Sequence, residues 1–571
     1  SCLLEENARY EYCIEAWTDR FGSWRRDMLK RLDAAQDVTS DLLEGLKILE
    51  EAAGRAAGSD RALLERWLQR IREQDSTRGA RLAVEEDLHA LAAAYPDRSG
   101  ATRSEPVLEV VVDRVRARFA AWYEFFPRSY GPDGQHGTFR DAIAELPRIA
   151  AMGFDVVYLP PIHPIGKVNR KGRNNSLTAA PDDPGSPWAI GSDEGGHDAV
   201  NPRLGTVEDF VAFREAAEKH GLEVALDFAI QAAPDHPWVK EHPGFFHHRP
   251  DGTIKFAENP PKKYEDIYPI NFHGSEAEAL WLELERVLEH WIGLGVKTFR
   301  VDNPHTKSFH FWEWVIERVK DRHPEVLFLA EAFTRPKVMR RLAKIGFSQS
   351  YTYFTWRNFK GEITEYLTEL TQSEMREYYR GNLWPNTPDI LHEFLVHSGR
   401  PGFKLRLALA ATLSSLYGMY SGYEVCDAEP FPGKEEYNNN EKYQLRSYDW
   451  GQPGNIVEYI TCLNRIRREN VALHEYDNLR FTEVGNDQLI AYWKATPYNR
   501  VLCVVNLDPH APHDGMVRVP LAEMGLPQDG PYRVIDLITD AEYTWSGEWN
   551  YVRLDPQVEP AHVLRLEPYT G

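Results

Sequence analysis

The fold is decided by residues 276–331, which read EAEALWLELERVLEHWIGLGVKTFRVDNPHTKSFHFWEWVIERVKDRHPEVLFLAE. A helix is predicted from Glu276 to about Ile292, and a short apolar strand follows at 296–301. Another helix then leads into a second buried strand at 326–330. Strands separated by helices predict a parallel sheet, because a crossover helix must carry the chain back to the edge where the first strand began.

The same alternation continues on both sides of this stretch. Strands are predicted at 155–160 and 222–228, and residues 206–209 form a capping box that opens a helix running to about His220. The uncharged stretch 407–423 is interpreted as a buried helix and strand, because its Thr, Ser and Gly residues make it too polar for a membrane span. This many units over about 350 residues favours a (β/α)8 barrel.

Different patterns flank the barrel. Residues 9–17 favour a strand, and Leu42, Leu46 and Leu49 recur at helical spacing, with Thr39 or Ser40 as the expected cap. A further helix is expected around 82–91, and apolar residues alternate with arginines at 114–119, which predicts a half-buried strand. The predicted domains are the end of an N-terminal β-sandwich at 1–23, a helical bundle at 24–98, a returning strand of that sandwich at 99–117, a catalytic barrel with inserted loops at 118–475, and a C-terminal antiparallel β-sandwich at 476–571.

The composition of the chain argues against several classes of partner and cofactor. The formal net charge is −21, which argues against nucleic acid or an anionic membrane as a partner. The five cysteines include no CxxC pair, so a reducing cytoplasm is predicted, and the N-terminus carries no signal pattern. Acidic and histidine residues at 193–198 match no metal-ligand spacing. We therefore predict no metal and no cofactor.

Acidic residues close several predicted barrel strands, the end where barrel enzymes place their chemistry. Asp302 ends VKTFRVD, Glu331 ends VLFLAE, Asp389 lies in WPNTPD, and Asp227 ends LEVALD. One such acid is more often a helix cap or an ion-pair partner, but several at successive strand ends indicate catalysis. Arg300 precedes Asp302 by two residues, so both side chains share a strand face. Two carboxylates acting as nucleophile and general acid/base describe retaining glycosyl transfer.

These motifs resemble those of glycoside hydrolase family 13, the α-amylase superfamily. The resemblance lies in TFRVDNPHTK (298–307), FLAEAF (328–333) and NTPD (386–389). More narrowly, the chain is similar to the bacterial α-1,4-glucan:maltose-1-phosphate maltosyltransferases. That similarity rests on WYEFFPRS, YLPPIHPIGKVNRKGRNN, GGHDAVNPRLGT, LDFAIQAAPDHPW, ENPPKKYEDIYPINF, LAEAFTRP and NNEKYQLRSYDW, which lie within residues 115–450. The family's N-terminal β-sandwich is longer, so we expect this chain to be an N-terminally shortened form.

The resemblance implies a role for each matching residue. Asp302 would be the nucleophile, Glu331 the acid/base, and Asp389 the transition-state stabiliser, with Arg300 holding Asp302. The positions that match donor-binding residues of the family are Lys171, Gln231, Asp266, Asn303, Lys442 and Tyr443. The implied partners are α-maltose 1-phosphate as donor and an α-1,4-glucan as acceptor, and the implied assembly is a homodimer. Independently, basic loops around 167–173, 262–263 and 442 are candidates for an anion pocket.

The predicted function is retaining transfer of a maltosyl unit from α-maltose 1-phosphate to the non-reducing end of an α-1,4-glucan. The chain is thus expected to be a glycosyltransferase that forms a covalent β-maltosyl–aspartate and releases phosphate. An α-glucan hydrolase or trehalose-forming enzyme is the alternative. The superfamily usually has Asn-His where Gln231-Ala232 stand and His before the third acid, where Pro388 stands, which argues against starch hydrolysis. A silent amylase-like interaction module would lack the carboxylates that this chain has.

Overall fold

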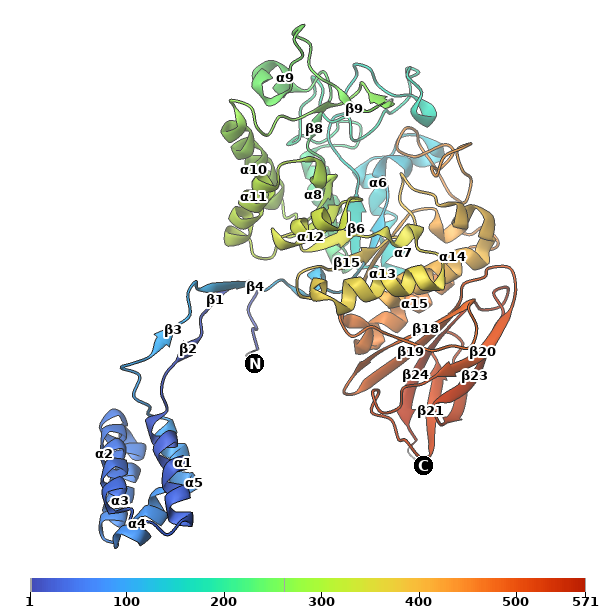
Figure 1. Cartoon of the computed structure of the whole chain (residues 1–571). Coiled ribbons are helices and arrows are strands. Elements are labelled where there is room, and N and C mark those ends of the chain that lie inside the picture. The colour runs from blue at the N-terminus through green and yellow to red at the C-terminus, as the bar shows by residue number, and fades with distance from the viewer. Residues whose placement is uncertain (1–2, 261, 570–571) are drawn as a thin grey trace. The chain divides into compact units, whose positions relative to one another are not determined.

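The computed structural model describes residues 3–260 and 262–569, and the chain divides into two compact units with the boundary after Val112. In the smaller unit, short antiparallel strand pairs accompany a helical bundle (Figure 1). The pairs join β1 (Arg9–Tyr12) with β4 (Leu108–Val111) and β2 (Glu15–Ala16) with β3 (Thr102–Arg103). The helices are α1 (Arg20–Asp33), α2 (Thr39–Arg55), α3 (Gly58–Arg72), α4 (Ser76–Ala83) and α5 (Glu86–Ala93).

The bundle has its own apolar core, in which Met28, Leu49 and Leu64 are fully buried. Two local expectations are corrected here. Neither Thr39 nor Ser40 caps α2, because both lie within the helix, whose N-cap position is Val38. The Asp37 carboxylate accepts the backbone N–H and the hydroxyl of Thr39. The single helix expected at 82–91 is instead the end of α4 and most of α5, which are separate helices.

Eight parallel strands of the larger unit close into a barrel (Figure 1). Its order around the wall is β12-β13-β14-β15-β16-β5-β6-β7. The strands are β5 (Ala120–Glu124), β6 (Val156–Leu159), β7 (Glu223–Phe228), β12 (Thr298–Asp302), β13 (Leu327–Glu331), β14 (Gln349–Tyr351), β15 (Gly381–Leu383) and β16 (Leu416–Tyr420). The (β/α)8 architecture expected from the sequence is thereby confirmed.

Helices surround the barrel in chain order between the strands. They are α6 (Phe139–Ile143), α7 (Leu146–Ala151), α8 (Val207–Lys219), α10 (Ala277–Gly293), α11 (Phe309–Arg322), α12 (Pro336–Lys344), α13 (Lys360–Gln372), α14 (Glu393–Leu413) and α15 (Val457–Glu469). Helix α8 begins with the predicted capping box between Thr206 and Asp209. No helix in the described parts of the chain is both long and apolar enough to cross a bilayer.

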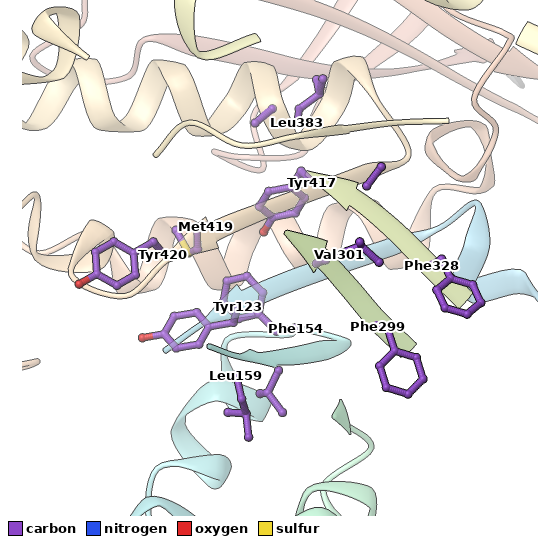
Figure 2. Packing of buried hydrophobic residues seen from close by; sticks show 14 of the residues in the cluster. Tyr123, Phe154, Leu159, Phe299, Val301, Phe328, Leu383, Tyr417, Met419 and Tyr420 are labelled. Carbon is purple, nitrogen blue, oxygen red and sulfur yellow. The ribbon is translucent and has the colours of Figure 1, made fainter. Parts of the chain in front are cut away.

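Alternation along each barrel strand separates two apolar layers. Tyr123, Phe299, Phe328 and Tyr417 belong to the large core that the strands share with the helices (Figure 2). Residues on the opposite face of the strands form a second cluster that fills the barrel interior, with Trp122, Tyr158, Ala225, Leu329, Tyr351, Trp384 and Leu416 among its members. Side chains two residues further along a strand point to the same face of the sheet. The strand-end acids therefore lie directly above the apolar cluster that fills the barrel interior.

The strand expected around 115–119 is absent, and this expectation was wrong. Residues Val115–Ala117 form a short 3-10 turn, and the barrel strand β5 begins at Ala120. The arginines alternate because each pairs with a different acid: Arg114 with Glu223, Arg116 with Asp155, and Arg118 with Glu475. The alternation of arginines and apolar residues therefore reflects ion pairing in a turn, although it has the same period as a half-buried strand.

The C-terminal segment is an antiparallel sheet with a second strand pair. The sheet order is β17-β18-β19-β24-β21-β22, and β20 pairs with β23. The strands are β17 (Arg480–Thr482), β18 (Leu489–Thr496), β19 (Asn499–Asn506), β20 (His513–Arg518), β21 (Pro531–Asp536), β22 (Glu542–Ser546), β23 (Trp549–Leu554) and β24 (Ala561–Pro568). Tyr492 joins the barrel's core while its neighbours Ala491 and Trp493 join a separate apolar cluster with Val552, so both faces of β18 are covered.

Long loops follow the carboxyl ends of β6 and β7 and carry several predicted binding residues. The second loop contains β8 (Gln231–Ala232) paired with β11 (Tyr268–Pro269), and β9 (Ala257–Asn259) paired with β10 (Lys262–Tyr264). It also contains the short helix α9 (Pro237–Glu241). Because both loops start where the strands end, they lie on the side of the barrel that carries the acids.

Candidate active site

One buried arginine holds three acids at the carboxyl ends of adjacent barrel strands. Arg300 lies opposite Asp227 in the pairing of β12 with β7, and Asp302 lies opposite Glu331 in the pairing of β12 with β13. Arg300 Nη1 is 2.8 Å from Asp227 Oδ2 and 3.0 Å from Asp302 Oδ1, and its Nη2 is 3.3 Å from Glu331 Oε1. Strand register therefore brings together three acids that lie 29 to 104 residues apart in the sequence.

The environment keeps Asp302 ionised. Burial works against its charge, since the residue is only 7% exposed, but Arg300, Lys307 and Lys442 outweigh burial and lower the pKa of its carboxyl. The Asn303 side-chain amide also donates to Asp302 Oδ2 at 3.4 Å. A carboxylate that stays charged and fixed in direction meets the requirement for a nucleophile.

The environment of Glu331 has the opposite effect. Burial, together with the nearby negative charge of Asp302, raises the pKa of Glu331 to about 7, although Arg300 opposes the shift. The backbone N–H of Asn303 donates to Glu331 Oε2 at 3.1 Å. Asn303 adopts a left-handed conformation with φ of 42°, which turns the chain directly after Asp302. Two acids whose pKa values are pushed apart are suited to the roles of nucleophile and acid/base.

Asp389 lies in the loop after β15, and it pairs with a lysine from another loop. Lys442 Nζ is 2.8 Å from Asp389 Oδ1 and 4.7 Å from the centre of the Trp188 ring. The Trp188 indole N–H in turn donates to Asp227 Oδ2 at 3.2 Å. Asp389 is thereby linked to the group around Arg300 through Lys442 and Trp188.

The remaining predicted binding residues surround this lysine. Asp266 lies in the electrostatic field of Lys171 and Lys442, which oppose the rise that burial causes in its pKa. Burial raises the pKa of Tyr443, and the charges of Lys442, Asp389 and Asp266 act on the same phenol. Gln231 is half-buried, and its amide donates to the Trp188 backbone carbonyl at 3.2 Å. The predicted donor-binding residues therefore gather beside the acids.

The basic loops contribute fewer residues to this group than the sequence led us to expect. Lys167 pairs with Asp193 at the surface, Arg173 pairs with Asp183, and the Arg170 guanidinium donates to backbone carbonyls. Lys263 is exposed and lies over the Phe256 ring, and the Lys262 side chain falls outside the described residues. Lys171 is the member of its loop that joins the group.

The acidic and histidine residues at 193–198 have other partners. Asp198 pairs with Arg286 at 2.8 Å, and His197 lies between His236 and the carbonyl of Ala229. Within residues 3–260 and 262–569, His, Cys, Asp and Glu side chains form no group of three or more that could hold a metal ion.

Comparison with known proteins identifies the family. Family models named "Alpha-1,4-glucan:maltose-1-phosphate maltosyltransferase, domain N/S" and "GLGE, C-terminal" match residues 1–114 and 481–566. A relative from Myxococcus xanthus named alpha-1,4-glucan:maltose-1-phosphate maltosyltransferase is 56% identical over 565 residues, covering 98% of this chain and 85% of the relative. The chain belongs to the α-1,4-glucan:maltose-1-phosphate maltosyltransferase family. A relative of the same name from Chlorobaculum tepidum is 52% identical over 566 residues, covering 97% of this chain and 84% of the relative.

Solved structures with the same fold come from α-amylases. A maltogenic α-amylase from Thermotoga neapolitana has a TM-score of 0.62 at 20% identity, covering 79% of this chain and 99% of that one. An α-amylase from Lactobacillus plantarum has a TM-score of 0.59 at 22% identity, covering 77% of this chain and all of the other. These likenesses show that the maltosyltransferase-family chain shares the amylase fold.

Two residues of this maltosyltransferase-family site were missed by the sequence analysis. Glu124 ends β5, is buried, and has its pKa raised well above the ordinary value by burial, with Asp227, Asp389 and Glu331 adding to the shift. Lys307 donates to the backbone carbonyls of Asp302 and Asn303, each at 3.3 Å. Glu124 follows the same rule as the other strand-end acids and could have been found by it, whereas nothing local distinguishes Lys307.

Proposed function

We propose that the chain transfers a maltosyl unit from α-maltose 1-phosphate to the non-reducing end of an α-1,4-glucan, with retention of configuration and release of phosphate. The observation that carries the proposal is the sharing of Arg300 between an ionised Asp302 and a Glu331 whose pKa is raised to about 7. The relatives that carry the maltosyltransferase name support the choice of donor and acceptor.

In the first step, a carboxylate oxygen of Asp302 attacks the anomeric carbon of the donor. The bond from that carbon to the phosphate oxygen breaks, and its electron pair leaves with phosphate. Glu331, protonated below its raised pKa, gives its proton to the departing oxygen. The product is a β-maltosyl ester of Asp302, in which the configuration at the anomeric carbon is inverted once.

In the second step, the 4-hydroxyl of the acceptor's terminal sugar attacks the same carbon. Glu331, now ionised, takes the hydroxyl proton, and the ester bond to Asp302 breaks. A second inversion gives net retention, and both carboxyls regain their starting protonation states. The catalytic cycle therefore balances protons and electrons without a metal or a cofactor.

The neighbouring residues are proposed to bind the donor. Asp389 holds hydroxyls of the reacting sugar and favours its distorted ring. Lys171 and Lys442 supply positive charge for the phosphate, Asn303 reaches it with its amide, and Tyr443 offers a hydroxyl. Gln231 and Asp266, which lie in the loop after β7, contact the sugar hydroxyls. The ion pair between Lys442 and Asp389 supports this assignment, as do the lysine charges that act on the pKa values of Asp266 and Tyr443.

The chain is also proposed to be a cytoplasmic homodimer. The four described cysteines, Cys13, Cys426, Cys462 and Cys503, are all free thiols, which supports a reducing cytoplasm. The homodimer rests on family resemblance alone. Light scattering on the purified chain at several concentrations measures its mass, and a mass of one chain throughout contradicts the dimer.

The decisive assay follows phosphate release from α-maltose 1-phosphate with and without a short maltooligosaccharide. We expect release to depend on the acceptor and the oligosaccharide to grow by two glucose units at a time. Liberation of free sugar from starch in water, with no dependence on the phosphorylated donor, would instead establish the hydrolase alternative.

A further inference from the structure

The proposed roles of Lys442 and Asp389 conflict in this structure, because the two side chains bind each other. Lys442 Nζ is 2.8 Å from Asp389 Oδ1, yet the lysine is assigned to the donor's phosphate and the aspartate to its sugar hydroxyls. Hydrogen bonding to sugar needs the carboxylate oxygens, and phosphate binding needs the ammonium. The contact occupies one carboxylate oxygen and one ammonium hydrogen, so both groups engage the donor fully only when the pair loosens.

The pair is built so that an anion can loosen it. The Asp389 side chain is 45% exposed and that of Lys442 is 20% exposed, and ion pairs so open to water are weak. A phosphate monoester carries close to two negative charges near neutral pH and so competes well with one carboxylate. Lys442 also has a second favourable neighbour, because its ammonium lies 4.7 Å from the centre of the Trp188 ring.

We propose that the Lys442–Asp389 pair selects for phosphorylated donors, because the donor's phosphate draws Lys442 away and so frees Asp389 to bind the reacting sugar. The inference rests on the proposed function and adds a specificity device to it. A neutral glucan in the same place offers Lys442 no anion, so its hydroxyls compete with Lys442 for the Asp389 carboxylate without compensation. The enzyme thereby disfavours cleavage of the glucan that it extends.

Lys442 differs in this respect from the other lysine of the group. Lys171 is 4% exposed, and its ammonium makes no hydrogen bond or ion pair with any described residue. Phosphate bound by Lys171 would release no catalytic group. The coupling between phosphate and sugar binding is therefore assigned to Lys442 alone.

Coupling of this kind is reciprocal and can be measured without turnover. The probes are inorganic phosphate and 1,5-anhydromaltitol, a maltose analogue that lacks the anomeric oxygen and so leaves room for phosphate. In calorimetric titrations of the wild-type chain, saturating phosphate should tighten anhydromaltitol binding about two- to fivefold, the range that a weak ion pair allows. Anhydromaltitol should tighten phosphate binding by the same factor.

Variants identify the residues responsible. Lys442→Gln and Asp389→Asn should each abolish the mutual tightening, whereas Lys167→Gln, which removes a surface lysine paired with Asp193, should retain it. Absence of tightening in the wild-type chain overturns the inference, and so does tightening that persists in Lys442→Gln. Phosphate release from maltose 1-phosphate by the wild-type chain is measured in parallel. If release occurs without tightening, only this inference fails, and if no release occurs, the proposed function fails.

Discussion

The protonation state of Glu331 offers the sharpest quantitative prediction, and the perturbation is pH. Burial and the charge of Asp302 raise the pKa of Glu331 to about 7. The general acid must carry its proton when the free enzyme meets the donor, so activity falls as pH rises through this pKa. With a pKa of about 7, the protonated fraction is about nine-tenths at pH 6 and about one-tenth at pH 8. The acid-dependent rate should therefore fall about tenfold over that range.

The assay is kcat/KM for phenyl α-maltoside, a donor that has no titrating group in this range and whose phenoxide leaving group needs a proton from the general acid. Because Arg300, Lys307 and Lys442 outweigh burial and keep Asp302 ionised well below pH 6, the profile should be nearly flat between pH 5 and pH 6. An acid with the ordinary pKa of 4.5 would already lose about eightfold across that unit. A Glu331→Gln variant should lose the limb near pH 7. A wild-type profile that falls steeply below pH 6, or does not fall by pH 9, refutes the reasoning.

Three further predictions concern the nucleophile and the fold. Asp302→Ala should lower transfer by roughly 10³-fold or more while donor affinity, measured by calorimetry, changes little; turnover near wild type would remove its role. Thr206→Ala removes the cap of α8 and should destabilise its first turn by about 1 kcal/mol, seen as faster amide hydrogen exchange there; unchanged exchange would contradict it. Gly418→Ala places a methyl 2.3 Å from the Trp384 ring. This overpacking should destabilise the fold by about 1–3 kcal/mol and lower the unfolding temperature. The control Gly361→Ala places a methyl that meets no atom within 4 Å and should not lower the unfolding temperature.

The barrel could be predicted because its signals are local and repeated. Buried strands alternate with helices, and the capping box at Thr206 marks a helix start that the structure reproduces. The expectation failed at 115–119, where arginines alternate with apolar residues for another reason. Arg114, Arg116 and Arg118 each pair with an acid distant in sequence, and no local pattern reveals such partners.

The residues of the site could be predicted from the sequence, but their protonation states could not. The spacing of Arg300 and Asp302 places both on one strand face, and the structure gives a contact of 3.0 Å between them. Which acids carry protons depends on burial and on partners from other strands. Glu124 and Lys307 act on the site through such tertiary proximity. The Lys442–Asp389 pair joins two loops and likewise has no signature in the sequence.

Covalent trapping tests most directly whether Asp302 and Glu331 act on one anomeric carbon. A Glu331→Ala variant is incubated with 2-deoxy-2-fluoro-α-maltosyl fluoride, whose fluorine at carbon 2 slows turnover of the ester, and the protein is then digested and weighed. We predict one added fluoromaltosyl group on the peptide that contains Asp302. An unmodified Asp302 peptide, in a protein that still consumes the reagent, would contradict the double-displacement account.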